Sequence, residues 1–135
     1  KVDGLDEAIV WGTGTPRREF LYVDDLADAC IFLMQSYSGE EIVNAGYGSD
    51  VTIRELVEMI SDVVGFRGAL KFDSSKPDGT PRKLIDSSRI SSMGWRPAVD
   101  LRSGLERTYD WFLENHTHQS SAESVGSIAV ASGGR

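Results

Sequence analysis

The sequence predicts a single domain of the α/β class. Short runs of β-prone residues alternate along it with longer segments whose apolar residues recur at helical spacing. Its 135 residues are sufficient for one domain, and an apolar share of 40% with a charged share of 26% is ordinary for a globular protein. Capping residues and glycines mark several helix boundaries, which favours the same class.

The N-terminal part is expected to begin with a hairpin. Residues 8–11 and 19–23 are β-prone, and the turn over residues 12–16 suits a hairpin with a longer loop. Asp24 or Asp25 then caps a helix that reaches about Tyr37. Its apolar stripe predicts a buried face made of Leu26, Cys30, Leu33, Met34 and Tyr37. Cys30 is therefore expected to be a buried core thiol.

The middle of the chain contains the helix with the clearest boundaries. A strand over residues 41–45 precedes it, and Thr52 with Glu55 forms a capping box at its start. Gly65 is the expected glycine at its C-terminal end. The predicted buried positions are Ile53, Leu56, Val57, Ile60 and Val64. A further strand is expected over residues 69–72.

The C-terminal part is predicted to be helical and then disordered. The segment DSSKPDGTPRK, residues 73–83, reads as an exposed loop. A short helix over residues 87–93 ends at Gly94, and Asp100 caps a last helix that runs to about Glu114. Residues 1–115 are expected to form the folded portion and residues 116–135 a disordered tail without aromatic residues. His116 and His118 in that tail lack the further ligands of a metal site.

Composition excludes several classes of function. The net charge of −7 leaves no basic stripe for a nucleic acid. No apolar run approaches the length of a membrane span, and the first residues do not have the pattern of a signal peptide. The single Cys30 excludes an internal disulfide framework and suits a reducing cytoplasm. The start at Lys1, close to a strand-like run, suggests a piece of a longer protein.

One turn has the order of a dinucleotide-binding fingerprint. Gly46 and Gly48 lie between a predicted strand and a helix, and Asp73 follows the next strand. The third position is Val51 rather than Gly or Ala, and Thr52 already caps the helix. We therefore interpret the segment as a strand-to-helix turn whose glycines supply positive φ.

The motifs of common catalytic sites are absent from the sequence. A lysine four residues after a tyrosine would indicate the proton relay of short-chain dehydrogenases. The residues found there are Leu26, Glu41, Val51 and Leu113. The sequence also lacks a Gly-x-Ser-x-Gly elbow, a His-Glu-x-x-His motif and a Walker sequence. No catalytic residue is expected in this chain.

Two basic clusters stand out against the acidic background. Arg17 and Arg18 follow the turn, and Lys76, Arg82 and Lys83 surround the sequence KPDGTPRK. Guanidinium groups bind phosphate oxygens bidentately, and two prolines stiffen the loop. Trp11 adds a flat face suited to a base or a sugar ring. A charged hairpin and a polar surface loop, with cation–π packing on Trp11, is the alternative without a ligand.

Five segments, in their order and spacing, resemble the C-terminal part of GDP-L-fucose synthases: VWGTGTPRREFLYVDDLADA, NAGYGSDVTIRELVEMI, FDSSKPDGTPRKLIDSSRI, GWRP and YDWFLEN. These are NADP-dependent epimerase-reductases of the extended short-chain dehydrogenase class. The resemblance runs from about Val10 to Asn115. WGTGTP-REF and KPDGTPRK are its specific parts, whereas REFLYVDDLADA has close variants across nucleotide-sugar epimerases and dehydratases.

The resemblance implies conversion of GDP-4-keto-6-deoxy-D-mannose to GDP-L-fucose by a cytoplasmic homodimer. It places Trp11, Arg18 and Asp78 among the contacts to the GDP-sugar, with Lys83 as a further one. Arg17 stands where a hydrophobic residue is expected and receives no contact. The N-terminal Rossmann half, which would bind NADP and carry the catalytic residues, is missing. The chain is then a C-terminal substrate-binding portion, inactive alone, whose Asp24 helix and Ile42 strand pack on the Rossmann sheet.

Two other functions stay open at this stage. The chain could be the corresponding part of another nucleotide-sugar epimerase or dehydratase, although KPDGTPRK argues against it. It could also be a nucleotide-sugar binding module without catalysis. A glycine fingerprint and a Tyr-x-x-x-Lys upstream of Lys1 would decide for the enzyme.

Overall fold

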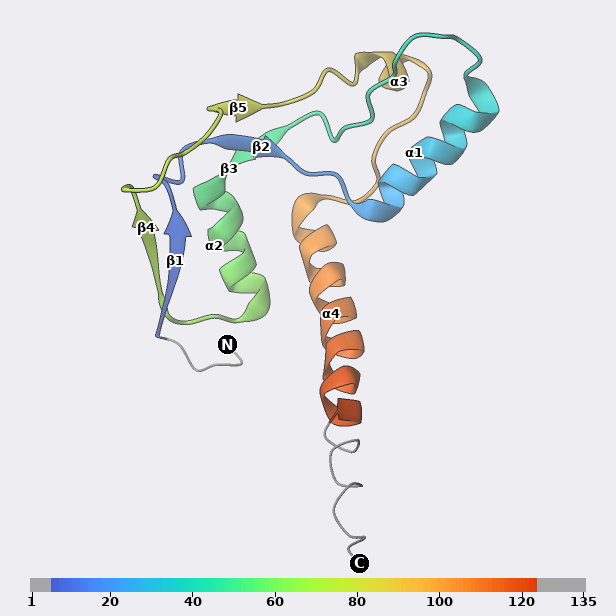
Figure 1. Ribbon diagram of the computed structural model, residues 1–135. Coiled ribbons are helices and arrows are strands. Elements are labelled where there is room, and N and C mark those ends of the chain that lie inside the picture. Colours follow the sequence, from blue (N-terminus) through green and yellow to red (C-terminus); the bar gives the residue numbers. More distant parts are fainter. Residues whose placement is uncertain (1–5, 124–135) are drawn as a thin grey trace, which may run out of the picture.

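The computed structural model describes residues 6–123, which contain both strands and helices, interspersed along the chain (Figure 1). This confirms the α/β class. The elements are β1 Glu7–Trp11, β2 Arg17–Glu19, α1 Val23–Ser36, β3 Asp50–Thr52, α2 Ile53–Val64, β4 Ala69–Asp73, β5 Arg82–Lys83, α3 Ser88–Ser92 and α4 Leu101–Glu123. Within the described residues, no helix is both long and apolar enough to span a membrane.

The strands form two separate sheets. β1 and β4 pair in parallel, and α2 connects the second sheet to β4. In the second sheet β2 is central, antiparallel to β3 and parallel to β5. The predicted hairpin is therefore wrong, because β1 and β2 lie in different sheets. Gly12 and Gly14 both have positive φ and turn the chain out of the first sheet before β2 begins.

The small core lies between α1, α3 and the segment after α3. Its buried residues are Ala29 of α1, Ile90 of α3 and Trp95. Half-buried apolar residues pack around them: Leu21, Phe32, Leu33, Val43 and Ala45. The β-prone run at residues 20–22 thus delivers Leu21 to this core and leads into α1, rather than extending the strand β2.

Asp25 anchors the connection to α4 and is not a helix cap. The N-cap of α1 is Tyr22, which makes no side-chain capping bond. Asp25 is only 7% exposed, and its Oδ2 accepts the backbone N–H groups of Ala98 at 3.1 Å and Val99 at 2.9 Å. One turn further, Asp28 accepts the indole N–H of Trp95 at 2.9 Å. Two acidic residues of α1 therefore hold the chain that leads to α4.

Much of the apolar stripe predicted for α1 faces outward. Leu33 packs on the core, but Leu26 and Cys30 are exposed and Met34 is 85% exposed. With Val23 these three residues form one side of the helix, called here the outer face of α1. The prediction of a buried Cys30 is wrong because the helix turns its opposite side, including Ala29, to the core.

The strand predicted over residues 41–45 is a loop. Val43 and Ala45 pack on the core, whereas Ile42 is 89% exposed. A strand requires a neighbour for its backbone N–H and C=O groups. Among the described residues, no strand pairs with this segment. Val43 and Ala45 are therefore held by side-chain packing rather than by strand pairing.

The other helix boundaries were predicted from local signals. Thr52 and Glu55 form the expected capping box, and Gly65 ends α2 in the left-handed conformation. α3 ends just before Gly94, and Asp100 accepts the backbone N–H of Ser103 at the start of α4. α4 continues beyond Glu114 to Glu123. The rest of the predicted tail lies outside the described residues, and the division at residue 116 stays a prediction.

Replacement of Asp25 by Ala should destabilise the protein by about 2–3 kcal/mol, because the N–H groups of Ala98 and Val99 lose a charged acceptor. The free energy of unfolding in urea measures the effect. Replacement of the exposed neighbour Asp24 by Ala is the matched control, since it removes only a charge near the helix N-terminus, worth at most about 1 kcal/mol. Equal losses for the two variants would contradict the anchoring role of Asp25.

The outer face of α1 should bind a polarity-sensitive dye. Contiguous exposed apolar surface binds such dyes and promotes self-association. A double variant with Leu26→Glu and Met34→Glu should lower the dye fluorescence and the tendency to self-associate. Its stability should change by no more than about 0.5 kcal/mol, since both side chains are exposed. Dye binding that is unaffected by the double variant would place the apolar surface elsewhere.

Candidate functional site

The site is assembled from the two connections that carry the chain between the sheets. Residues 12–16 lead from β1 to β2, and residues 74–81 lead from β4 to β5. Figure 1 shows both at the same end of the β1–β4 pair. Asp78 joins them: its Oδ1 accepts the backbone N–H of Thr13 at 2.6 Å, and its Oδ2 accepts the Thr13 hydroxyl at 2.7 Å. Asp78 therefore fixes the turn against the loop.

Gly12 is required for this approach of the two connections. Its φ is +89°, and a Cβ at this position would overlap Asp78 Oδ1. Its backbone N–H also donates to the carbonyl of Asp73 at 2.9 Å, which continues the pairing of β1 with β4 by one residue. Only glycine combines the left-handed conformation with the space that the carboxylate occupies.

Trp11 lies at the outer edge of the same arrangement. It is 72% exposed, and Lys76 Nζ lies 5.5 Å from the centre of its ring. This geometry is that of a weak cation–π contact on an exposed ring. The cation–π packing on Trp11 expected in the alternative without a ligand is therefore present, with a lysine of the loop as its partner. Most of the indole surface stays open to a planar or apolar group.

Arg18 and Lys83 lie side by side on neighbouring strands. They are direct register partners of the parallel pair β2–β5, so their side chains leave the sheet on the same face. A hollow of about 550 Å³ is lined by both residues, together with Gly46 and Ile85. Gly79 lies beside Arg18, since a Cβ on Gly79 would be 3.9 Å from Arg18 Nη2. The loop that carries Asp78 thus passes close to the Arg18 guanidinium.

The adjacent pair of cations on these strands has a protein counter-ion. Arg17 and Arg82 are also register partners, and both bind Asp50 of β3. Arg17 Nε donates to Asp50 Oδ1 at 2.8 Å, its Nη2 donates to the Asp50 carbonyl at 2.8 Å, and Arg82 Nε donates to Oδ2. The Asp50 side chain is 4% exposed. Hydrogen bonds from Arg82, and then from Arg17, hold the pKa of Asp50 below its ordinary value.

Arg18 and Lys83 differ from that pair in their charge balance. Among the described residues, neither forms an ion pair with a carboxylate. Arg18 Nη1 donates to the backbone carbonyl of Arg17 at 2.7 Å, which orients the guanidinium without neutralising it. Two like charges directly opposite on neighbouring strands repel each other. An anion in the hollow would remove this repulsion.

Glu19 is a structural member of the site that the sequence analysis missed. Its carboxylate accepts the backbone N–H of Gly48 at 2.6 Å and that of Ile85 at 3.2 Å. It thereby links the segment that follows Gly46 to Ile85, and Glu19 itself also lines the hollow. An acidic residue two positions after Arg17, inside a short strand, is a signal for cross-strand bonding that could have identified it.

The turn that resembles a dinucleotide fingerprint does not fit a dinucleotide. Binding of a pyrophosphate there requires free N–H groups at the N-terminus of α2. Those of Ile53 and Arg54 donate to the carbonyls of Pro16 and Gly14, both at 2.9 Å, and that of Glu55 donates to Thr52 Oγ1. The helix terminus is therefore used to hold the turn over residues 12–16. Among the described residues, no cluster of acidic, histidine or cysteine side chains could hold a metal ion either.

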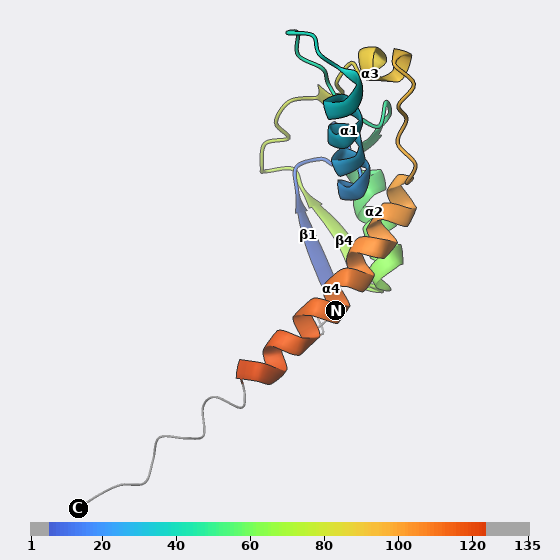
Figure 2. The same cartoon turned by 90° about the vertical axis from the view of Figure 1, so that its right-hand side faces the viewer.

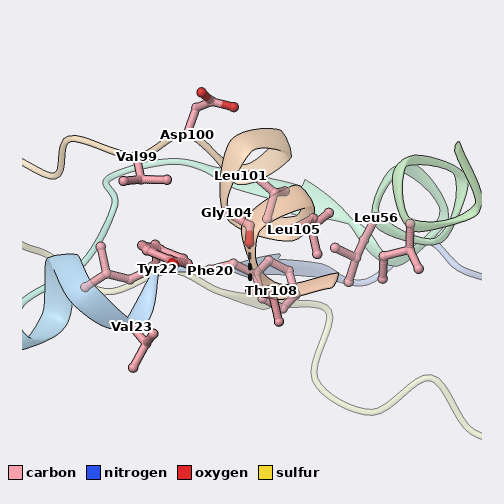
Figure 3. A pocket seen from close by; sticks show the side chains of 12 residues that line it. Phe20, Tyr22, Val23, Leu56, Val99, Asp100, Leu101, Gly104, Leu105 and Thr108 are labelled. Atoms are coloured by element: carbon pink, nitrogen blue, oxygen red, sulfur yellow. Dashed lines mark hydrogen bonds between the residues drawn. The ribbon is translucent and has the colours of Figure 1, made fainter. Parts of the chain in front are cut away.

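A second hollow is apolar and lies away from these charges. It has a volume of about 380 Å³ and lies between the start of α1, α2 and α4, with Tyr22, Leu56 and Leu105 among its lining residues (Figure 3). Its polar groups serve the helix itself: the Thr108 hydroxyl donates to the carbonyl of Gly104 at 2.7 Å. Its lining includes Asp100 but no basic residue that could bind a phosphate, so the hollow beside Arg18 and Lys83 is the candidate site.

Known proteins are similar to this chain in both sequence and fold. Residues 2–46 match the NAD dependent epimerase/dehydratase family. Over 115 residues the chain is 64% identical to GDP-L-fucose synthase 1 of Arabidopsis thaliana. The aligned stretch covers 85% of this chain and 36% of that protein. It is 48% identical over 120 residues to GDP-L-fucose synthase of Escherichia coli, with 81% of this chain and 37% of that protein covered.

A solved structure has the same arrangement of elements. GDP-L-fucose synthetase from Naegleria fowleri bound to NADP superimposes with a TM-score of 0.78 at 28% identity, over 82% of this chain and 36% of that chain. The chain is thus similar to part of the enzymes of the NAD dependent epimerase/dehydratase family. Its resemblance to GDP-L-fucose synthase, deduced from five short segments, is confirmed. The chain spans about a third of the length of the curated synthases it matches.

The acid stability of the protein should depend on Asp50. Because the pKa of Asp50 is lower in the folded state than the unfolded value of about 3.9, its ionised form stabilises the fold fully above about pH 5. That contribution is lost as the pH falls through the folded pKa. An Asp50→Asn variant lacks it, so its urea midpoint should fall less between about pH 5 and pH 2.

The same comparison controls for other carboxyl groups. Glu55, Asp86 and Asp100 also have lowered pKa values, each because of hydrogen bonds from nearby backbone or side-chain donors. Both proteins retain these groups, so the difference between their pH profiles isolates Asp50. Parallel profiles would contradict a stabilising ionised Asp50.

Proposed function

We propose that this chain is the GDP-sugar-binding part of an NADP-dependent GDP-L-fucose synthase. The reaction would convert GDP-4-keto-6-deoxy-D-mannose to GDP-L-fucose, with epimerisation and then reduction of the sugar. The observation that carries the proposal is the pair of adjacent cations, Arg18 and Lys83, without a carboxylate partner among the described residues. A diphosphate supplies the missing negative charge.

Arg18 is the main phosphate contact in this proposal. Its guanidinium presents a planar fork of donors that matches two phosphate oxygens. One nitrogen is held by the carbonyl of Arg17, so the fork is oriented before a ligand arrives. Lys83, its register partner, adds a second charge beside it. The diphosphate would lie in the hollow between Gly46 and Ile85.

Trp11 and Asp78 have different roles in the same site. The open face of Trp11 is proposed to contact the guanine or the sugar ring. Asp78 is already bonded to Thr13, but each carboxylate oxygen can accept a further hydrogen bond. Asp78 would therefore hold the turn and accept a hydroxyl of the ribose or the sugar with its remaining lone pairs.

The cofactor and the catalytic residues are proposed to lie on the stretch of the synthases that this chain does not match. NADP is bound to the synthetase from Naegleria fowleri, and the helix N–H groups that follow the turn at Gly46 and Gly48 are occupied in this chain. The outer face of α1 and the exposed Ile42 would pack against that stretch. The 135 residues alone would then be inactive. The complete enzyme would work as a cytoplasmic homodimer.

Replacement of Arg18 by Ala in the full-length enzyme tests the proposal. A charge-assisted bond to a phosphate contributes about 1.5–3 kcal/mol, so kcat/KM for the GDP-sugar should fall roughly 10- to 150-fold. Arg18→Lys should restore only part of this loss, because the ammonium lacks the planar fork. The affinity for NADPH should change little. Steady-state kinetics at two ionic strengths and a cofactor titration measure these effects.

Arg67→Ala is the matched control, since Arg67 is an exposed arginine before β4, at the end of that strand remote from Asp73. It should leave kcat/KM unchanged. A normal kcat/KM in Arg18→Ala would refute the phosphate contact. Tight binding of GDP-mannose without any turnover by the full-length protein would instead identify a non-catalytic binding module.

A further inference from the structure

We propose that Asp50 is a positioning residue for the phosphate-binding pair, because it holds β5 against β2 and so keeps Lys83 beside Arg18. The inference rests on the proposed function, since it concerns the same hollow. Asp50 lines none of that hollow, and neither the sequence motifs nor the relatives pointed to it. Its role follows from the contacts of its neighbours.

The attachment of β5 to the sheet is short. β5 has two residues, Arg82 and Lys83, which pair with Arg17 and Arg18 of the central strand. A backbone hydrogen bond from Arg17 N–H to the Pro81 carbonyl, at 2.8 Å, lies at the start of this pairing. A two-residue strand at a sheet edge has few backbone bonds to keep it in place. Side-chain contacts therefore decide its position.

Asp50 supplies such a contact across the whole sheet. It belongs to β3, on the opposite side of β2 from β5. Its carboxylate reaches Arg17 through one oxygen and Arg82 through the other. The two outer strands are thus joined through one buried charge. Without that charge, two adjacent guanidinium groups would repel each other across the β2–β5 pair.

The effect reaches the hollow through the alternation of side chains. Arg17 and Arg82 project from one face of the β2–β5 pair, and Arg18 and Lys83 project from the other. Holding the first pair together fixes the backbone distance of the second pair. Asp50 therefore has no contact with the ligand, yet it sets the spacing of the two cations that receive the phosphates.

The test measures the dissociation constant of GDP by calorimetry on the full-length protein. Asp50→Asn should raise the dissociation constant about 3- to 10-fold, because Lys83 is no longer held beside Arg18. In an Arg18→Ala background, the same substitution should change it by less than about 2-fold. A merely structural role would weaken binding equally in both backgrounds.

Two further variants keep the test decisive. Arg17→Leu combined with Asp50→Asn removes one of the repelling guanidiniums and should recover part of the GDP affinity and of the thermal stability. Asp100→Asn, a change of the same chemistry at the cap of α4, should lower stability without changing the dissociation constant.

The possible failures are distinct. An unchanged dissociation constant in Asp50→Asn, or an equal rise with and without Arg18, would overturn the positioning role while leaving the phosphate contact of Arg18 intact. An unchanged dissociation constant in Arg18→Ala would instead refute the proposed function of the hollow itself.

Discussion

The carboxylate of Asp50, buried between two guanidinium groups, is the interaction on which the arrangement of the charged residues depends. It binds both Arg17 and Arg82, which lie next to each other as register partners of β2 and β5. The neighbouring positions, Arg18 and Lys83, then meet on the other face. A single acid thus separates four clustered cations into a neutralised pair and a pair available to an anion.

The rest of the structure supports this small sheet from two sides. The core around Ala29 and Trp95 holds α1 against the segment before α4. The segment that follows β2 and the segment that leads to α4 are therefore fixed to each other. On the other side, the first turn of α2 binds the carbonyls of the turn over residues 12–16. Figure 2 shows that α4 extends away from this body, so the site depends little on its outer half.

The sequence predicted features that depend on near neighbours. The ends of α2 were predicted correctly because Thr52, Glu55 and Gly65 act within one helical turn. The predicted hairpin was wrong because β1 pairs with β4, which lies far away in the sequence. Arg18 and Asp78 were predicted as ligand contacts through resemblance, whereas Asp50 was not predicted because its partners lie 32 and 33 residues away. The apolar stripe on α1 was predicted to be buried, but among the described residues nothing packs on its exposed members Leu26, Cys30 and Met34.

The link between Thr13 and Asp78 joins residues 65 positions apart, and this has a consequence for protein synthesis. A nascent chain leaves the ribosome from its N-terminus, at about 5–20 residues per second. The turn over residues 12–16 therefore waits several seconds before Asp78 and β5 emerge. During that interval the turn lacks its contact with Asp78, and β2 lacks its contact with β5. β3 and the first turn of α2, which contact β2 and the turn, emerge earlier, so the binding surface is completed last by the segment that carries Asp78 and β5.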